Sequence, residues 1–511
     1  MNIKVAKKEI SNSIKAYLAK DEKGEYLIPT TRQRPILLMG PPGVGKTAIM
    51  EQVASENKIA LVSYTITHHT RESAVGVAQI VNMHYNKESF QVTSYTMSEI
   101  IAEIYHKMNR TGLNEGILFL DEINCVDESL SPSILQFLQF KTFGTHSIPD
   151  GWVIVVAGNP SEYNDSVKDF DMVTLDRLKR MEIAPDFDVW REYAFKARVN
   201  NAIISYLYNN RDDFYVIGKN IADKQFVTAR GWEDLSDMLT AYEKYNLEVS
   251  FDFIQEYVQH PHVASSFYEY YNRYVSNVKN MDIKTAFETG DADKVMAQYS
   301  ALEEDMKTAF MIKTVHELAE IVYECEYQKL YAYNVVKMAE EVGKIYETSR
   351  SNYRSNTYSV TEGMRQMLTK QIEANLVSRN QISAMRNAIK FVDDIALKYA
   401  RGTDEMLFIA EIYKDIQKEF EPIDSFYEAF LNKTKVMFNN AFYITKAIFA
   451  DGKYDEYMDE FRKNYHIVNF INNELKDEYG YLIKDITDMN LDNGDDVCYQ
   501  KAAICVHGTA R

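Results

Sequence analysis

The chain has 511 residues, enough for about two to four domains, and 46% of them are hydrophobic, as in an ordinary globular protein. Its formal net charge of −18 argues against a general nucleic-acid surface or an anionic-membrane surface, because phosphate groups are bound by basic stripes. No apolar stretch reaches about 18 residues and the first residues lack the apolar core of a signal peptide, so we expect no membrane span and a cytoplasmic protein. Four scattered cysteines lack metal-site spacing, which predicts reduced thiols.

The first expected element is a helix over residues 1–30, because Val5, Ile10, Ile14 and Leu18 recur at roughly helical spacing. A polar turn follows around residues 21–24. An apolar run at 35–39 then predicts the first strand of a sheet.

A glycine-rich loop of the pattern G-x-x-x-x-G-K-[ST] joins this strand to a helical pattern. In that context, backbone N–H groups converge on an anion at a helix N-terminus. We expect the Lys46 amine to reach the outer phosphates of a nucleotide and the Thr47 hydroxyl to ligate Mg2+. The alternative is an ordinary glycine turn. The candidate nucleotide-binding residues are Gly40, Pro41, Pro42, Gly43, Val44, Gly45, Lys46, Thr47 and Ala48.

Residues 59–66 are rich in β-formers and predict a second strand, which leads into the adjacent His68 and His69. Neighbours on one strand point to opposite faces, so polar contacts are favoured over a metal site. Short β-like segments at 77–83 and 90–95 flank a turn and predict a hairpin, inserted before a helix at 97–108.

A buried strand at 116–120 runs directly into Asp121 and Glu122. An unbroken apolar run is typical of a parallel sheet, and ligands of such sheets collect at the carboxyl ends of the strands. Asp121 is expected to hold the Mg2+ shell and Glu122 to polarise an attacking water. The alternative is an acidic helix cap.

A third apolar strand, at 152–158, ends in Asn159. The Asn159 amide is expected to emerge near Glu122, where it would hold the water and sense the outer phosphate. Asn-Pro alone is only a turn signal, so this assignment depends on position along the chain.

These three strand ends resemble the AAA+ ATPases. Residues 40–47 match the Walker A motif, 117–122 match Walker B, and Asn159 matches the sensor-one residue. The inserted hairpin, the turn at 143–152 and the motif at 175–178 look more narrowly like the helix-two-insert group, closest to the MoxR family, although the family usually has Phe where this chain has Leu178. The resemblance covers about residues 1–260.

The resemblance implies roles for two arginines. Arg177 matches the finger that stabilises charge on the nucleotide of a neighbouring subunit, and Arg180 is close enough to compete. The alternative for both is a surface cation paired with nearby aspartates.

Arg230 follows a helix N-cap at Thr228, where a cation opposes the helix dipole. Glu233 and Asp234 could offset that charge locally. The resemblance implies instead that Arg230 is the sensor-two arginine, which contacts the γ-phosphate.

Nine of ten prolines lie at or before Pro261, so the first half is expected to be α/β and the second to consist of long helices whose aromatic residues build a core. We therefore expect a P-loop AAA+ core with a parallel sheet flanked by helices (1–188), a small helical lid (189–260) and a helical C-terminal domain (261–511).

The resulting functional hypothesis is a magnesium-dependent, MoxR-like ATPase that acts as a ring, expected to be a hexamer, to remodel or activate a partner protein. The resemblance implies a partner with a von Willebrand factor A domain. Three alternatives stay open: a chelatase-type motor, a GTP-using relative because no feature reads the base, and a nucleotide-gated scaffold with little turnover.

Overall fold

The computed structural model describes the whole chain except residues 69–71, 73, 75, 86–87, 127–129, 164–169, 219–224, 349–355, 401–408, 485 and 487–511. Its contacts divide the chain into two compact units. Unit 1 comprises Met1–Val189, Tyr215–Gly231 and Lys370–Val377, and unit 2 comprises Trp190–Phe214, Trp232–Thr369 and Ser378–Arg511. The three-domain division expected from the sequence, with boundaries after residues 188 and 260, stays a prediction.

Unit 1 is built on a five-stranded parallel sheet with the order β2-β5-β8-β1-β9. The α/β class and the parallel sheet expected from the sequence are therefore confirmed. The fifth strand, β9, was not expected, because only Met181 of its four residues is buried and the segment has no apolar run. The strands are β1 (Ile36–Met39), β2 (Ala60–Thr65), β5 (Gly116–Asp121), β8 (Trp152–Gly158) and β9 (Lys179–Glu182).

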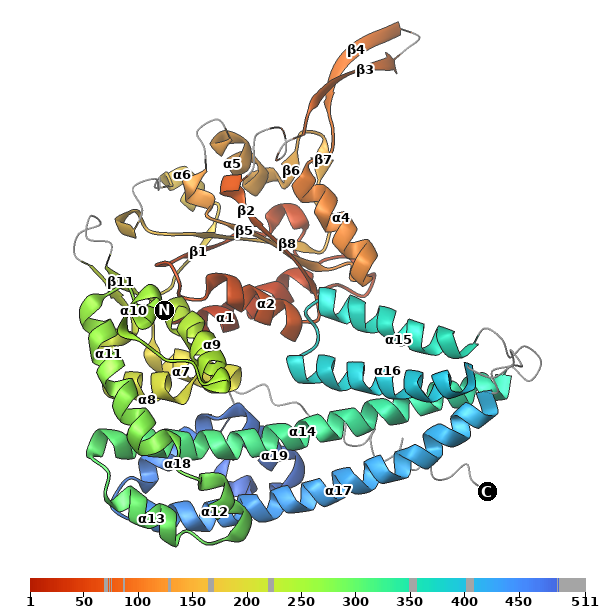
Figure 1. Ribbon diagram of the computed structural model, residues 1–511. Coiled ribbons are helices and arrows are strands. Elements are labelled where there is room, and N and C mark those ends of the chain that lie inside the picture. The colour runs from red at the N-terminus through yellow and green to blue at the C-terminus, as the bar shows by residue number, and fades with distance from the viewer. Residues whose placement is uncertain are drawn as a thin grey trace. The chain divides into compact units, whose positions relative to one another are not determined.

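Helices cover both faces of this sheet (Figure 1). Side chains alternate between the faces along a strand, so Ile36 and Leu38 pack with α1 and α2 while Leu37 packs with α4 and α5. This burial explains why the strands read as unbroken apolar runs. The helices of the unit are α1 (Ile3–Leu18), α2 (Lys46–Glu56), α4 (Glu99–Thr111), α5 (Ser131–Phe140) and α6 (Met172–Leu175).

Helix α1 is shorter than expected, since it ends at Leu18. The segment beyond it turns back, with an isolated bridge between Lys20 and Tyr26. The Gly24 N–H donates to the Asp21 carbonyl at 3.0 Å, so the polar turn expected around residues 21–24 is confirmed, whereas a helix extending over residues 1–30 was wrong. The apolar spacing that suggested the helix does not continue beyond Leu18.

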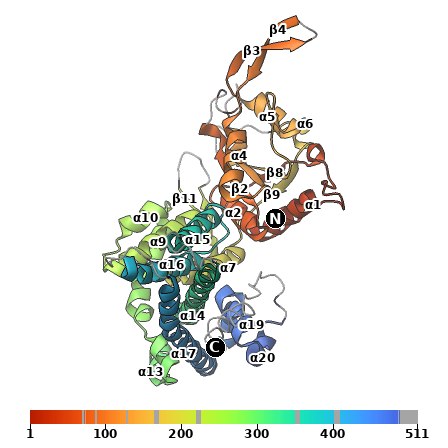
Figure 2. The ribbon, with the colours of Figure 1, turned by 90° about the vertical axis from the view of Figure 1, so that its right-hand side faces the viewer.

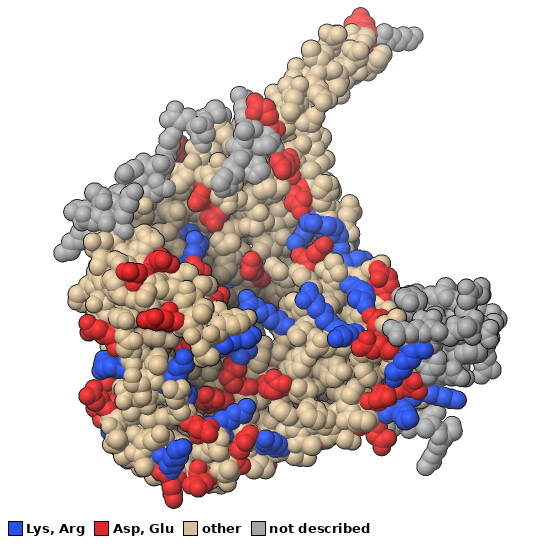
Figure 3. Space-filling model, in the orientation of Figure 1, with Lys and Arg blue, Asp and Glu red and all other residues tan. Residues whose placement is uncertain are grey.

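The expected hairpin is formed by β3 (Ala78–Tyr85) and β4 (Glu88–Tyr95) and projects from the sheet (Figure 1). On the face shown in Figure 3 its surface is almost entirely uncharged apart from the tip. Two shorter hairpins, β6 (Thr142–Phe143) with β7 (His146–Ser147) and β10 (Val216–Ile217) with β11 (Phe226–Val227), complete the strands.

Unit 2 is helical, as expected for the second half of the chain. Its longest helices, α14 (Glu304–Thr348) and α17 (Ile409–Ile448), pack side by side (Figures 1 and 2). The other helices wholly in the unit are α8 (Asn201–Asn209), α10 (Phe251–Tyr257), α11 (Pro261–Tyr274), α12 (Ile283–Thr289), α13 (Asp293–Ser300), α16 (Arg379–Ala400), α18 (Tyr454–Lys463), α19 (Tyr465–Glu474) and α20 (Lys476–Tyr479); α7 (Phe187–Ala197), α9 (Ala229–Tyr245) and α15 (Asn356–Glu373) lie mostly in it.

Aromatic residues fill the core of unit 2, in agreement with the expectation from the sequence. The Phe438 ring contacts those of Phe461, Phe470 and Tyr479, with centroids 5.3–6.0 Å apart. Such edge and tilted contacts stabilise a core beyond the area that they bury. This cluster is one place where aromatic residues of the second half build the core.

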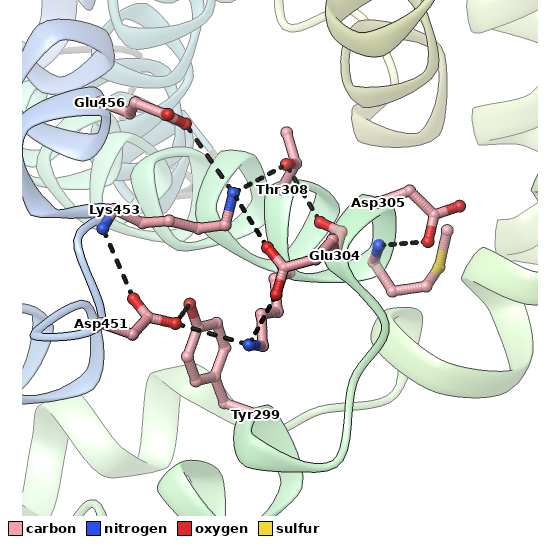
Figure 4. Close-up of polar contacts among 9 residues, drawn as sticks. Tyr299, Glu304, Asp305, Thr308, Asp451, Lys453 and Glu456 are labelled. Atoms are coloured by element: carbon pink, nitrogen blue, oxygen red, sulfur yellow. Dashed lines mark hydrogen bonds and ion pairs between the residues drawn. The ribbon is translucent and has the colours of Figure 1, made fainter.

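A charged network joins the start of α14 to the segment after α17 (Figure 4). The Glu304 carboxylate lies 2.9 Å from the Lys307 amine and 3.7 Å from the Lys453 amine. Asp451 accepts a 2.9 Å hydrogen bond from the Tyr299 hydroxyl and lies 3.6 Å from Lys307. Because acidic and basic side chains alternate in this cluster, each charge is compensated by a neighbour of opposite sign. The cluster can therefore be explained by a structural role.

A buried ion pair links α7 to α18 within unit 2. The Arg191 Nη1 atom lies 3.2 Å from Glu460 Oε1, and the two side chains are only 2% and 1% exposed. Burial raises the pKa of Glu460, and the charge of Arg191 lowers it. The net pKa is raised, because burial outweighs the attraction of the Arg191 charge.

We expect Arg191→Met to lower the free energy of unfolding by about 3 kcal/mol, because Glu460 would stay buried with only the Lys463 amine, at 3.6 Å, to compensate it. Denaturant unfolding measures this change. The control is Arg273→Met, whose pair with Asp305 is largely exposed and worth about 0–1 kcal/mol. Equal losses in the two variants would contradict the argument.

Candidate active site

The glycine loop adopts the backbone conformation that a phosphate cradle needs. Gly43 and Gly45 have φ values of 72° and 88°, and Gly45 is the N-cap of α2. An added Cβ on Gly43 would lie 2.8 Å from the Cβ of Thr228, so a side chain there would be both strained and obstructed. The loop is thus held close to the start of α9, with its N–H groups at a helix N-terminus.

Lys46 is anchored inside this loop and is only 8% exposed. Its amine donates hydrogen bonds to the carbonyl oxygens of Gly40 (2.7 Å) and Pro41 (3.0 Å) and to the Oδ1 atom of Asn159 (2.9 Å). The structure therefore brings Lys46, which follows β1, to Asn159 at the end of β8, although the two residues are 113 positions apart along the chain.

The charge state of Lys46 is unusual. Burial lowers its pKa to about 8, Asp121 and Glu122 act in the opposite direction, and the positive charge of Arg230 lowers it too. A desolvated ammonium group with carbonyl and amide partners gains from a nearby anion. The site therefore favours an anionic ligand such as a polyphosphate.

We expect nucleotide binding at pH 8 to be accompanied by uptake of about half a proton, because Lys46, with a pKa of about 8, is then half deprotonated and phosphates raise its pKa again. Calorimetric titrations in two buffers of different ionisation enthalpy measure this uptake. Lys141→Met is the matched control: its amine also has a pKa lowered to about 8 by burial, but the attractive charge beside it is Asp150. Loss of the uptake in this control, or its absence in the unmodified chain, would contradict the assignment.

Thr47 and Asp121 form the second pair. The Thr47 hydroxyl donates a 3.1 Å hydrogen bond to Asp121 Oδ2 at the end of β5. In P-loop proteins, Mg2+ is coordinated by a hydroxyl and a carboxylate of the protein, and water and phosphate oxygens fill its remaining coordination positions. The donor set therefore fits Mg2+ bound with a nucleotide.

Glu122 begins a 3-10 turn, η3 (Ile123–Cys125), with a φ of 57°. Its Oε2 atom accepts a 2.9 Å hydrogen bond from the hydroxyl of Thr67, which lies just beyond β2 in η2 (Ile66–His68). The sequence did not identify Thr67 as a partner of Glu122, because a single threonine at a strand end has no motif of its own. Its position just after a strand could have indicated this contact, because the carboxyl ends of all the parallel strands lie at the same edge of the sheet.

Arg230 lies at the start of α9, in the part of that helix that belongs to unit 1. Thr228 caps α9 as expected, since its hydroxyl accepts from the N–H of Gly231 at 3.2 Å. The Tyr215 hydroxyl donates a 2.7 Å hydrogen bond to the carbonyl of Pro42, a contact that the sequence did not suggest. Arg230 is exposed and near enough to depress the pKa of Lys46.

Arg177 and Arg180 make contacts elsewhere in the unit. The Arg177 guanidinium donates a 2.8 Å hydrogen bond to Gln139 of α5, and Arg180 forms a 2.7 Å ion pair with Glu182. Both side chains are exposed. A residue that acts on a neighbouring subunit is expected to be exposed in a single chain, so their roles stay predictions.

His69, the second of the adjacent histidines, lies outside the described residues. Among the described residues, no group of three His, Cys, Asp or Glu side chains could hold a metal ion. Within the same residues, none of the helices has the length and apolar character needed to cross a membrane.

Residues 36–163 match the family model described as ATPase family associated with various cellular activities (AAA). This segment is an AAA domain. It runs from the first residue of β1 to the end of the turn after Asn159, so it contains both ends of the Lys46–Asn159 contact, and it stops before Arg177. Family membership makes P-loop ATPase chemistry the general expectation for the AAA domain.

No curated protein matches the chain. Among solved structures, PCH-2 of C. elegans is similar at 13% identity over 53% of this chain and 69% of that chain, with a TM-score of 0.26. A likeness at that TM-score does not establish a shared fold.

Proposed function

We propose that the chain is a magnesium-dependent ATPase of the MoxR type, which uses ATP hydrolysis in a ring to remodel or activate a partner protein. The observation that carries the proposal is the set of contacts joining Lys46 to Asn159 and Thr47 to Asp121. Three strand ends that are distant in sequence are brought together there by two hydrogen bonds, in the arrangement that binding one nucleotide requires.

Each of the proposed nucleotide-binding residues contributes a different chemical group to the site. The glycine loop offers N–H groups, and Lys46 gives up its carbonyl and amide partners for phosphate oxygens. Thr47 and Asp121 would hold Mg2+, which when bound neutralises charge that develops on the phosphate. Of the remaining nucleotide-binding residues, Pro41 and Pro42 have no N–H and would shape the loop, while Val44 in the loop and Ala48 in the first turn of α2 would contribute backbone N–H groups.

Glu122 is proposed to take a proton from the attacking water, and Asn159 to orient that water. The Thr67 hydroxyl bonds the Oε2 atom of Glu122, and Oε1 is the second acceptor oxygen that could take the proton. We propose that the Thr67 contact is a resting arrangement that is released when nucleotide binds, so that the carboxylate can turn to the water.

The finer elements of the proposal come from the family resemblance. A hexameric ring would place Arg177 of one subunit against the nucleotide of the next, and Arg230 would contact the outer phosphate from within the same chain. The lid at 189–260 would transmit the nucleotide state to the helices at 261–511. The partner is proposed to carry a von Willebrand factor A domain, and the location is proposed to be the cytoplasm.

One observation favours a second candidate function, a nucleotide-gated scaffold that binds ATP with little turnover. If the bond between Thr67 and Glu122 persists with nucleotide bound and holds the carboxylate away from the water, the chain acts by binding alone. The ATPase and the scaffold would both bind ATP, and they would differ in the rate at which they hydrolyse it.

Phosphate release by the purified chain, measured with and without Mg2+ over a range of protein concentrations, tests the proposal. We expect turnover that requires Mg2+ and rises per chain as rings assemble, because Arg177 acts between subunits. ATP binding with a negligible rate at every concentration would favour the scaffold.

A further inference from the structure

Asn124 is a buried amide beside the proposed active site whose role the motifs do not assign. It lies in η3, two residues after Glu122, and is 4% exposed. Burying an amide is costly unless its donors and acceptors are satisfied, so its partners indicate what it does.

Both polar atoms of the Asn124 side chain bond to the backbone of Asn159. Its Nδ2 donates to the Asn159 carbonyl (2.7 Å), and its Oδ1 accepts from the Asn159 N–H (3.3 Å). A side-chain amide is the group that can donate and accept in this paired way. The ladder between β5 and β8 ends at Leu120 and Val156, so Asn124 holds the backbone where the sheet no longer does.

The residue before Asn159 is shaped to admit this contact. A Cβ on Gly158 would lie 2.5 Å from Oδ1, 2.9 Å from Cγ and 3.2 Å from Nδ2 of Asn124. All three of its nearest neighbours belong to Asn124. Gly158 has no left-handed φ, so an alanine there would be obstructed by the Asn124 side chain rather than strained by its own backbone.

We propose that Asn124 is a positioning residue that fixes Asn159 relative to Glu122. The 3-10 turn ties it to Glu122, because the N–H of Cys125 donates to the Glu122 carbonyl at 3.0 Å. Its amide sets the backbone of Asn159, whose side chain reaches Lys46. Asn124 thereby fixes the position of the Asn159 amide, which would hold the water, relative to the Glu122 carboxylate, which would polarise it. The inference rests on the proposed ATPase function.

The first test is Asn124→Ala. We expect kcat to fall about 10- to 100-fold, as for a displaced catalytic group, with nucleotide Kd changed less than about threefold. Asn57→Ala is the control: that amide also donates and accepts in unit 1, with Nδ2 donating to the Ser11 hydroxyl (3.0 Å) and the Val53 carbonyl (2.8 Å) and Oδ1 accepting from the Ser11 hydroxyl (3.2 Å). The control is expected to keep its kcat. Equal effects on kcat in both variants would show a merely structural role and overturn the proposal.

The second test uses the close approach of Gly158. Gly158→Ala is expected to lower kcat, because its methyl group displaces the Asn124 amide, whereas adding Gly158→Ala to Asn124→Ala is expected to cost nothing further. Additive losses would overturn the proposal. Circular dichroism and thermal melts establish that each variant is folded, so that a low rate is assigned to positioning only in a folded chain.

Failure of the inference and failure of the proposed function are distinguishable. If the unmodified chain binds ATP but does not hydrolyse it, the ATPase function is wrong. If it hydrolyses ATP and Asn124→Ala does so at the same kcat, only the positioning role is wrong.

Discussion

Glu122→Gln is expected to lower the rate of ATP hydrolysis by about 10²- to 10⁴-fold and to leave nucleotide affinity close to that of the unmodified chain. Glutamine has nearly the same shape and still accepts the Thr67 hydroxyl through its carbonyl oxygen, but it cannot take a proton from water. Phosphate release gives the rate, and a fluorescent nucleotide titration gives the affinity.

Asp459→Gln is a suitable control, since this acid lies in unit 2 and lines a surface groove of about 470 Å³ on α18. Its rate should match that of the unmodified chain. An unchanged rate in Glu122→Gln would indicate that the measured turnover does not use this carboxylate and would support the scaffold.

The Glu122→Gln variant also tests the identity of the proposed partner protein, because it should bind ATP without hydrolysing it and so stay in the ATP-bound state. Captured proteins are compared with those retained by Lys46→Ala, which is expected not to bind nucleotide. Enrichment of a protein with a von Willebrand factor A domain is the expected result, and its absence would contradict that part of the proposal.

Arg177→Ala is expected to lower the rate by about 10³- to 10⁵-fold if its guanidinium stabilises the transferred phosphoryl group across a subunit interface. The same change should have little effect on folding, because the side chain is exposed and its bond to Gln139 is a surface contact. Arg180→Ala is the comparison, since that cation is already paired with Glu182 and lies three residues away.

Mixing the two defective variants separates action within a subunit from action between subunits. A ring containing both Arg177→Ala and Glu122→Gln has interfaces with an intact Glu122 on one side and an intact Arg177 on the other. Partial recovery of hydrolysis is expected. No recovery at any mixing ratio would argue against Arg177, and recovery with Arg180→Ala instead would move the role to that residue.

The strands of the AAA domain could be predicted from sequence because burial on both faces leaves a plain signal. Residues 116–120 and 152–158 are unbroken apolar runs, and each leads directly into polar residues at the ligand edge. The glycine loop could be predicted because its spacing reflects a backbone requirement. Strand β9 was missed because one buried residue in four leaves no pattern.

Contacts between distant residues could not be read from the sequence in the same way. Thr67 and Asn124 look like ordinary polar residues next to stronger motifs, and what they do depends on which atoms the sheet places within 3.5 Å. The end of α1 was missed because apolar spacing indicates that a helix exists more reliably than where it stops. The long helices of unit 2 followed from the scarcity of proline, whereas their packing depends on side-chain fit.

The central claim is that Lys46, Thr47, Asp121 and Asn159 form one nucleotide site. Isothermal titration of the unmodified chain and of Lys46→Ala with ATP, each with and without Mg2+, tests it most directly. We expect one ATP to bind per chain, more tightly with Mg2+, and we expect Lys46→Ala to lose this binding. Binding of equal affinity in both proteins, or none in the unmodified chain, would contradict it.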